Sequence, residues 1–148
     1  MTVRRLAAIG GLAMGLLVAI GCGREFLSGP PRICRTSVSP SELPFTGGSV
    51  TVTVEVCPSA GVTRITGQLR RPDGTAVGEP VELARVRGRQ WSGDLSVPGN
   101  TRTDADVEYV ITVRACDKCG GETPAPGVEA GRVRVKAAPS LPEPPFRP

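Results

Sequence analysis

The sequence predicts an all-β domain assembled from about seven short strands. Aromatic residues make up only 3% of the 148 positions, whereas the chain has 19 glycines and 15 prolines. This mixture, together with frequent valine and threonine, favours strands and turns over helices. The strongest pattern is the alternation of apolar and polar residues that a half-buried strand requires. It occurs in residues 49–56 and again in residues 107–115, where only Val110 departs from it.

Each predicted strand has one apolar face and is bounded by turn signals. Residues 49–56 place four valines on one face, and residues 107–115 form the central strand. Residues 71–74 read Arg-Pro-Asp-Gly, in which proline presets a turn and glycine supplies a positive φ. The predicted strands are residues 36–39, 49–56, 62–70, 80–86, 91–97, 107–115 and 131–136. Short strands of this kind predict two antiparallel sheets packed face to face.

Residues 1–21 have the features of an export signal. Arg4 and Arg5 precede a run of about 15 apolar or glycine residues, which is short for a membrane-spanning helix of roughly 20 residues. The sequence Ala-Ile-Gly-Cys at positions 19–22 resembles the cleavage box of bacterial lipoproteins. That resemblance implies that Cys22 is acylated, for example with palmitate, and anchors the chain on a membrane. The alternatives are an ordinary cleaved signal or an uncleaved anchor.

The segments on either side of the strands have no periodic pattern. Residues 22–35 contain two prolines and are expected to form a short tether behind the anchor. Residues 137–148 are rich in proline, which cannot donate ladder hydrogen bonds, so we expect an extended, disordered tail. The predicted folded domain therefore covers residues 36–136.

This domain resembles a known family in its strand and turn motifs. Residues 109–120 read Tyr-Val-Ile-Thr-Val-Arg-Ala-Cys-Asp-Lys-Cys-Gly, and residues 91–98 read Trp-Ser-Gly-Asp-Leu-Ser-Val-Pro. With the Arg-Pro-Asp-Gly turn, these runs resemble bacterial extracytoplasmic immunoglobulin-like domains and, in related form, fibronectin type III domains. The resemblance implies a two-sheet antiparallel immunoglobulin-like sandwich of about seven strands. It specifies no function, because this fold hosts many unrelated roles.

Besides Cys22, the chain has four cysteines, and the immunoglobulin-like topology implies that they gather at one end of the sandwich. In an exported protein the default is two disulfides. Alternation within their strands places Cys57 and Cys116 at the rim and not in the core. Four cysteines allow three pairings. We favour Cys34 with Cys57, on neighbouring antiparallel strands, and Cys116 with Cys119, within one turn.

Two alternatives use the same cysteines for chemistry. Cys116 and Cys119 have the spacing of a zinc knuckle, and two further thiols would complete a four-thiolate zinc site. A redox-active Cys-x-x-Cys pair is the second alternative. Active pairs of that type sit at helix starts that lower the thiol pKa, whereas this motif follows a strand. The disulfide interpretation therefore remains the preferred one, with no metal or other cofactor.

Composition excludes several classes of function. There is no histidine, so imidazole-based catalysis and histidine metal sites are absent. Without Arg4 and Arg5, 16 basic residues face 14 acidic ones, too even a balance for a nucleic-acid-binding protein. Acidic residues beside turns usually cap or close the turn, and the alternative is a calcium site or a carboxylate pair for hydrolysis, formed from Asp94, Asp104, Asp106 and Asp117.

Alternating arginines on strands usually form the solvated face, and the alternative is a basic patch for anionic lipid or polysaccharide, formed from Arg64, Arg70, Arg85, Arg87 and Arg89.

These observations together predict a non-catalytic module of the bacterial cell envelope. We expect it to be lipid-anchored on the extracytoplasmic side of a membrane, with the outer membrane favoured. Its role would be to bind an envelope protein or polysaccharide, or to act as a structural module. We expect no catalytic residues.

Overall fold

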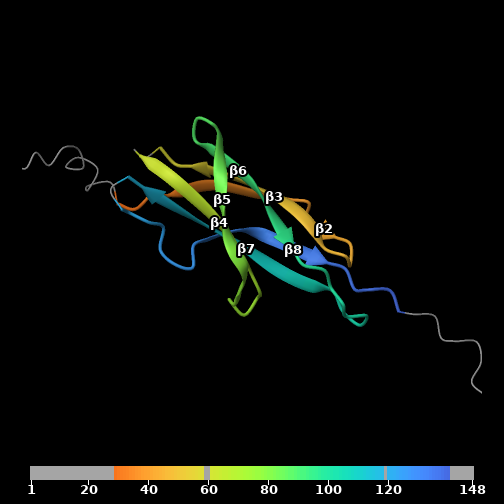
Figure 1. The fold of residues 1–148 in the computed structure, drawn as a ribbon. Coiled ribbons are helices and arrows are strands. Elements are labelled where there is room, and N and C mark those ends of the chain that lie inside the picture. The colour runs from red at the N-terminus through yellow and green to blue at the C-terminus, as the bar shows by residue number, and fades with distance from the viewer. Residues whose placement is uncertain (1–28, 59–60, 119, 141–148) are drawn as a thin grey trace, which may run out of the picture.

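The computed structural model describes residues 29–58, 61–118 and 120–140, and within them the protein is all-β, as predicted (Figure 1). All seven predicted strands are present. An eighth, β2, pairs in parallel with β8 through only two residues, too few to show any period in the sequence. The strands are β1 (Ile33–Ser39), β2 (Glu42–Leu43), β3 (Gly48–Val56), β4 (Val62–Arg70), β5 (Ala76–Arg87), β6 (Gln90–Val97), β7 (Val107–Asp117) and β8 (Val128–Val135).

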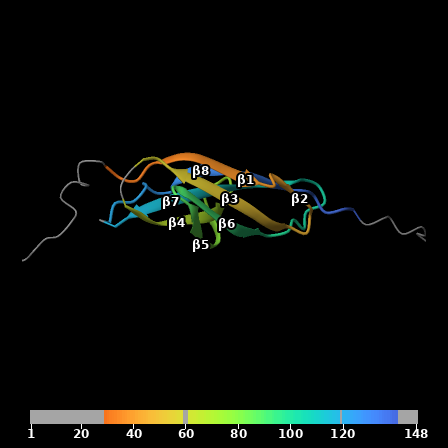
Figure 2. The ribbon, with the colours of Figure 1, turned by 90° about the horizontal axis from the view of Figure 1, so that it is seen from above.

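Strand ladders join all eight strands into one mixed sheet, in the order β1-β3-β6-β5-β4-β7-β8-β2. Two separate sheets were expected, and β5 explains the difference. Its first part pairs with β4, as far as Leu83, and its last part, Ala84 to Arg87, pairs with β6. One long strand therefore links two groups of strands that would otherwise be separate. Figure 2 shows that the result is curled and not flat.

The curl brings strands that share no ladder against each other across the interior. A methyl group built on Gly67 of β4 would lie 3.2 Å from Leu95 Cδ1 of β6. A methyl group built on Gly131 of β8 would lie 2.9 Å from Val38 Cγ2 of β1. Neither pair of strands is hydrogen-bonded in the sheet. The two halves of the sheet thus cover one common core.

The core consists of the alternate residues that the sequence pattern placed on one face. Val50, Val52 and Val54 of β3 are fully buried. The corresponding positions of the central strand β7 are buried as well, including Ile111, Val113 and Ala115. Full burial of one such aliphatic side chain contributes about 1.5 to 3 kcal/mol. The alternation therefore supplies the main stabilising term of the domain.

A buried polar side chain, Asn100, secures the end of the domain where β8 leaves the sheet. Its Nδ2 group donates to the carbonyl oxygens of Ala105 at 2.8 Å and Lys136 at 3.2 Å. Its Oδ1 atom accepts from the Arg102 amide at 2.9 Å. Its own amide donates to Phe45 O at 2.7 Å. Because buried polar groups are costly unless hydrogen-bonded, this residue is fixed by at least three chain segments.

Two glycines with similar positive φ differ in the free space around them, so their alanine variants separate backbone strain from steric clash. Gly47 has φ of +76°, and a methyl group there would lie 2.7 Å from Gly99 N. Gly74 has φ of +88° but no atom within 4 Å of that position. We expect Gly74→Ala to lower the free energy of unfolding by about 1 to 2 kcal/mol through backbone strain alone. Gly47→Ala should cost at least about 2 kcal/mol more, because backbone atoms cannot yield.

Urea denaturation of both variants measures this difference. Equal losses in the two variants would mean that the close approach of the 45–47 turn to residues 97–99 is wrong.

Candidate functional site

The cysteines predicted to gather at one end of the domain are only partly within the described residues. Cys34 and Cys57 form a disulfide, which confirms the favoured first pairing. Cys116, expected in a second bridge, carries a free thiol. Cys119, its expected partner, and the lipidation residue Cys22 lie outside the described residues. The described part of this end therefore contains the bridge and the Cys116 thiol.

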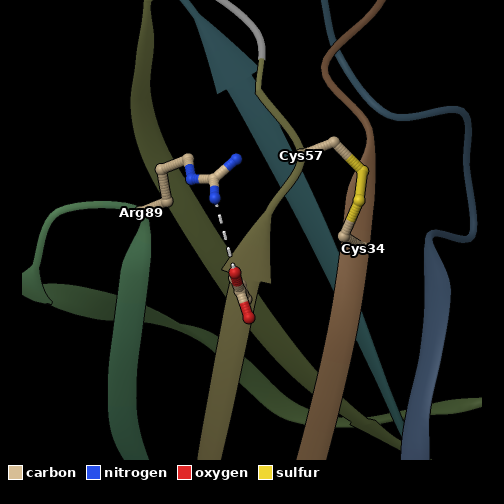
Figure 3. The surroundings of a disulfide bond; sticks show 4 residues. Cys34, Cys57 and Arg89 are labelled. Carbon is tan, nitrogen blue, oxygen red and sulfur yellow. Dashed lines mark ion pairs between the residues drawn. A yellow bond between two sulfur atoms is a disulfide. The ribbon is translucent and has the colours of Figure 1, made fainter.

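The bridge joins β1 to the chain just after β3. Ile33 pairs with Val56 and Arg35 with Glu55, so Cys34 is an extra residue at a β-bulge of β1, and its Cα lies 5.0 Å from that of Cys57. Figure 3 shows the bridge at the rim, near the ion pair that Arg89 makes with Glu55 at 3.7 Å. Cys34 is exposed. The bridge thus lies at the rim, as predicted. It joins the terminal strand β1 covalently to its neighbour β3.

The Cys116 thiol lies on β7 between an acidic and a basic side chain. Its Sγ atom donates to Glu122 Oε1 at 3.0 Å, and Arg64 Nη2 on β4 approaches the sulfur at 3.9 Å. Arg114 Nη2 in turn contacts Glu122 Oε2 at 2.7 Å. Burial and the Glu122 carboxylate raise the pKa of Cys116, and Arg64 opposes them only in part. The hydrogen bond from the thiol and the charge of Arg114 lower the pKa of Glu122.

This environment keeps Cys116 protonated at neutral pH. The thiolate, not the thiol, is the nucleophile and the metal ligand, and reactive cysteines have a lowered pKa. Here the pKa is shifted in the opposite direction. The arrangement disfavours the redox alternative.

The four-thiolate zinc alternative fails for a different reason. Cys34 and Cys57 are oxidised to a disulfide, so they cannot serve as thiolate ligands. In the described parts of the chain, no three Cys, Asp or Glu side chains are grouped to hold a metal ion. A zinc site that uses all four cysteines is therefore incompatible with this structure.

Thr123 ties the N-terminal entry segment to this end of the domain, a role that sequence reasoning missed. Its side chain is 5% exposed. The hydroxyl accepts from the Ala115 amide at 3.1 Å and donates to Pro31 O at 3.2 Å. Next to it, the Cys57 amide donates to Arg32 O at 2.9 Å. The segment before β1, expected to be part of a loose tether, is thus docked from Pro31 onward.

The candidate acidic residues are each engaged in a local structural interaction. Asp94 accepts from the Thr51 hydroxyl at 2.6 Å, and Asp104 pairs with Arg102 at 3.0 Å. Asp106 Oδ1 accepts from the Ala137 amide, and Asp117 Oδ1 from the Gly121 amide. The Asp94 contact joins paired residues of β3 and β6, the Asp104 contact is an ion pair, and Asp117 closes a turn.

The candidate arginines are distributed over different surroundings. Arg64 and Arg70 lie toward opposite ends of β4. Arg85 lies over the Trp91 ring at 5.1 Å from its centroid, and Arg89 pairs with Glu55. Arg87 is exposed. Arg70 lines a hollow on the outer face of the sheet.

Comparison with protein-family models and with curated proteins finds no match for this chain. Among the residues that the structure describes, no helix has the length and apolar character needed to cross a membrane.

The disulfide closes a loop of moderate length, since 23 positions separate its cysteines. The double variant Cys34→Ser/Cys57→Ser should therefore lose about 3 kcal/mol of unfolding free energy by the chain-entropy estimate. Cys116→Ser is the matched control and should change stability by less than about 1 kcal/mol. Denaturation in urea gives both values. Equal stabilities of the double variant and the unmodified chain would refute the proposed staple.

The surroundings of Cys116 predict opposite effects of two substitutions on its reactivity. Glu122→Gln removes a negative charge beside the thiolate, so the pKa of Cys116 should fall and alkylation at pH 8 should speed up. Arg64→Gln removes the opposing positive charge, so alkylation should slow down. Peptide mapping after timed iodoacetamide treatment measures the rate at Cys116 alone. Changes of the same sign, or a Cys116 that reacts only after reduction, would contradict this description.

Proposed function

We propose that this protein is a lipid-anchored, non-catalytic immunoglobulin-like module of the bacterial cell envelope. The observation that carries the proposal is the Cys34–Cys57 disulfide, and the predicted export signal in residues 1–21 supports it. Disulfides persist in oxidising compartments outside the cytoplasm. The leader and the bridge therefore support the same location by independent arguments.

The position of the bridge also supports attachment through Cys22. Cys34 follows Cys22 by 12 positions, and the chain is docked from Pro31 onward by the Thr123 hydroxyl. A pull on the N terminus would act first on β1, a terminal strand of the sheet that pairs only with β3. The disulfide lies at the N-terminal end of β1, where a force on the N terminus would act first. A covalent bond there would resist separation of β1 from β3 in an anchored domain.

The strand order supports the immunoglobulin-like assignment. An immunoglobulin constant-type domain has strands ABED in one sheet and CFG in the other. Lettered in chain order without the two-residue β2, the strands here run β1-β3-β6-β5 and then β4-β7-β8, which is the same order. The domain departs from antibody domains in its bridge, which joins the first two long strands in place of the second and sixth. It also departs in the ladder between β4 and β5.

The chemistry of the described residues favours binding over catalysis. The candidate carboxylates are engaged in hydrogen bonds or ion pairs within the domain, and the one free thiol of the described residues has a raised pKa. We infer a role in holding an envelope protein or polysaccharide, or in structural support, with no role in nucleic-acid binding. The outer membrane is the favoured location.

Mass spectrometry of the N-terminal peptide tests the anchor. We expect the chain produced in a bacterial host to begin at Cys22 and to carry the added mass of acyl chains. Cys22→Ser is the control and should lose that mass and leave the membrane fraction. Because a single acyl chain binds membranes only marginally, several chains are expected. An unmodified Cys22 on a mature chain would refute the lipid anchor.

A further inference from the structure

A groove on the outer face of the sheet is a candidate binding surface that the cysteine-bearing end does not use. It crosses β4, β7 and β8 and has a volume of about 290 Å³. A second hollow of about 140 Å³ adjoins it and shares Arg70, Thr112 and Pro126 with it. The two hollows together form the outer-face groove.

The groove contains a polar side chain, Thr112, whose burial is not expected from the alternation of the sequence. Thr112 lies between the fully buried Ile111 and Val113, so it faces away from the core, yet it is only 6% exposed. Its Oγ1 atom accepts a hydrogen bond from Arg70 Nε at 3.2 Å. Arg70 and Pro126 line the hollow around it. Thr112 is thus enclosed on the outer face, where it positions Arg70.

Arg70 is held in place without being neutralised. Its Nη1 atom donates to Gly74 O at 2.9 Å, which with the Thr112 bond occupies two of the five N–H groups of the guanidinium. Among the described residues, neither Arg70 nor its neighbour Arg71 forms an ion pair. The nearby Asp73 carboxylate accepts from the Thr75 amide at 2.8 Å, and this hydrogen bond and the charge of Arg71 lower the pKa of Asp73. Three N–H groups of a fixed guanidinium therefore remain for a ligand.

Arginines outnumber acidic residues in the lining of the larger hollow. Three arginines and one glutamate line it, and Arg132 pairs both with that glutamate, Glu129, and with Glu108 of β7, each at 2.8 Å. The remaining lining is largely apolar, with Pro72, Val110 and Pro126 beside the arginines. A fixed arginine is the side chain best suited to bind a carboxylate through two parallel hydrogen bonds.

We propose that the outer-face groove binds an extended acidic segment of a partner protein, with a Glu or Asp carboxylate on Arg70 and apolar neighbours on the prolines and Val110. This inference rests on the proposed function, because it names the partner class of a module taken to be a binding domain. No aromatic ring lines either hollow, so a sugar ring has no surface on which to stack. A peptide is therefore favoured over a polysaccharide.

The location of the groove argues against a lipid headgroup. Arg70 pairs with Val110 near the start of β7, whereas the N-terminal entry segment lies at the other end, where Val62 pairs with Asp117. Val62 and Arg70 bound a strand of nine residues, so about 26 Å separate the two ends. A domain anchored at its N terminus would hold the groove away from its own membrane. The groove is placed to meet a partner protein.

Titration of the full chain, isotope-labelled and kept in neutral detergent, tests the proposal by NMR. The probe is an end-capped peptide that alternates glutamate with valine, and its glutamine counterpart is the control peptide. We expect saturable shifts of the Gly74, Thr112 and Gly127 amides with the glutamate peptide. Binding of the glutamine peptide should be at least about tenfold weaker, because charge-assisted hydrogen bonds are lost.

Three variants separate the groove from general attraction to a basic surface. Arg70→Gln and Arg71→Gln should each weaken binding of the glutamate peptide, by about tenfold for Arg70→Gln. Arg87→Gln, which removes the same charge from an exposed position on β5, should leave it unchanged. If Arg70→Gln lowers the melting temperature enough to unfold the chain, the Arg71→Gln result decides.

Several outcomes would overturn the proposal. Equal weakening by Arg87→Gln would mean unspecific charge attraction, and shifts confined to other amides would mean a different surface. If hyaluronan, or vesicles containing phosphatidylglycerol, shift the same amides while the glutamate peptide does not, the partner is a polysaccharide or a lipid. The acyl mass on Cys22 is measured separately, so failure of the groove and failure of the lipid anchor are distinguishable.

Discussion

The burial of alternate side chains on the inner face of one curled sheet is the constraint on which the rest of this structure depends. The valines of β3 and the aliphatic residues of β7 are removed from water only because the sheet turns back over them. The long strand β5 makes that turn possible, since it pairs with β4 along its first part and β6 along its last. The ladders between neighbouring strands of this sheet then position the disulfide, the Cys116 thiol and the outer groove.

The sequence predicted the fold where the periodic signal was strong. Residues 49–56 and 62–70 were placed within one residue of the observed strands β3 and β4. β5 was placed only in part, because most of its side chains are exposed and show no alternation. β2 was missed because two residues carry no period. Its place is set by pairing with β8, a contact between segments distant in sequence.

The candidate site was predictable to a similar degree, and for the same reason. The Cys34–Cys57 pair followed from two strands expected to be antiparallel neighbours. Thr123 and Thr112 were not identified, because a threonine that closes a turn or positions an arginine looks like any exposed threonine in the sequence. Their burial depends on segments brought together only by the fold, such as Pro31 against Thr123 and Arg70 against Thr112.

One end and the outer face of the domain therefore have separate roles. One end receives the chain from the proposed anchor and is reinforced by a covalent bridge and a buried hydroxyl. The outer face presents a fixed, unneutralised arginine in an apolar groove. Neither feature points to a catalytic role. The raised thiol pKa of Cys116 is consistent with a structural cysteine.

Nuclear Overhauser contacts across the interior test the curl most directly. The structure requires contacts from the Gly67 α-protons to the Leu95 methyl groups and from the Gly131 α-protons to a Val38 methyl group. Neither contact joins strands that are paired in the sheet. Observation of both contacts is the result this account predicts. Their absence, with the strand ladders intact, would describe an open sheet and contradict the common core.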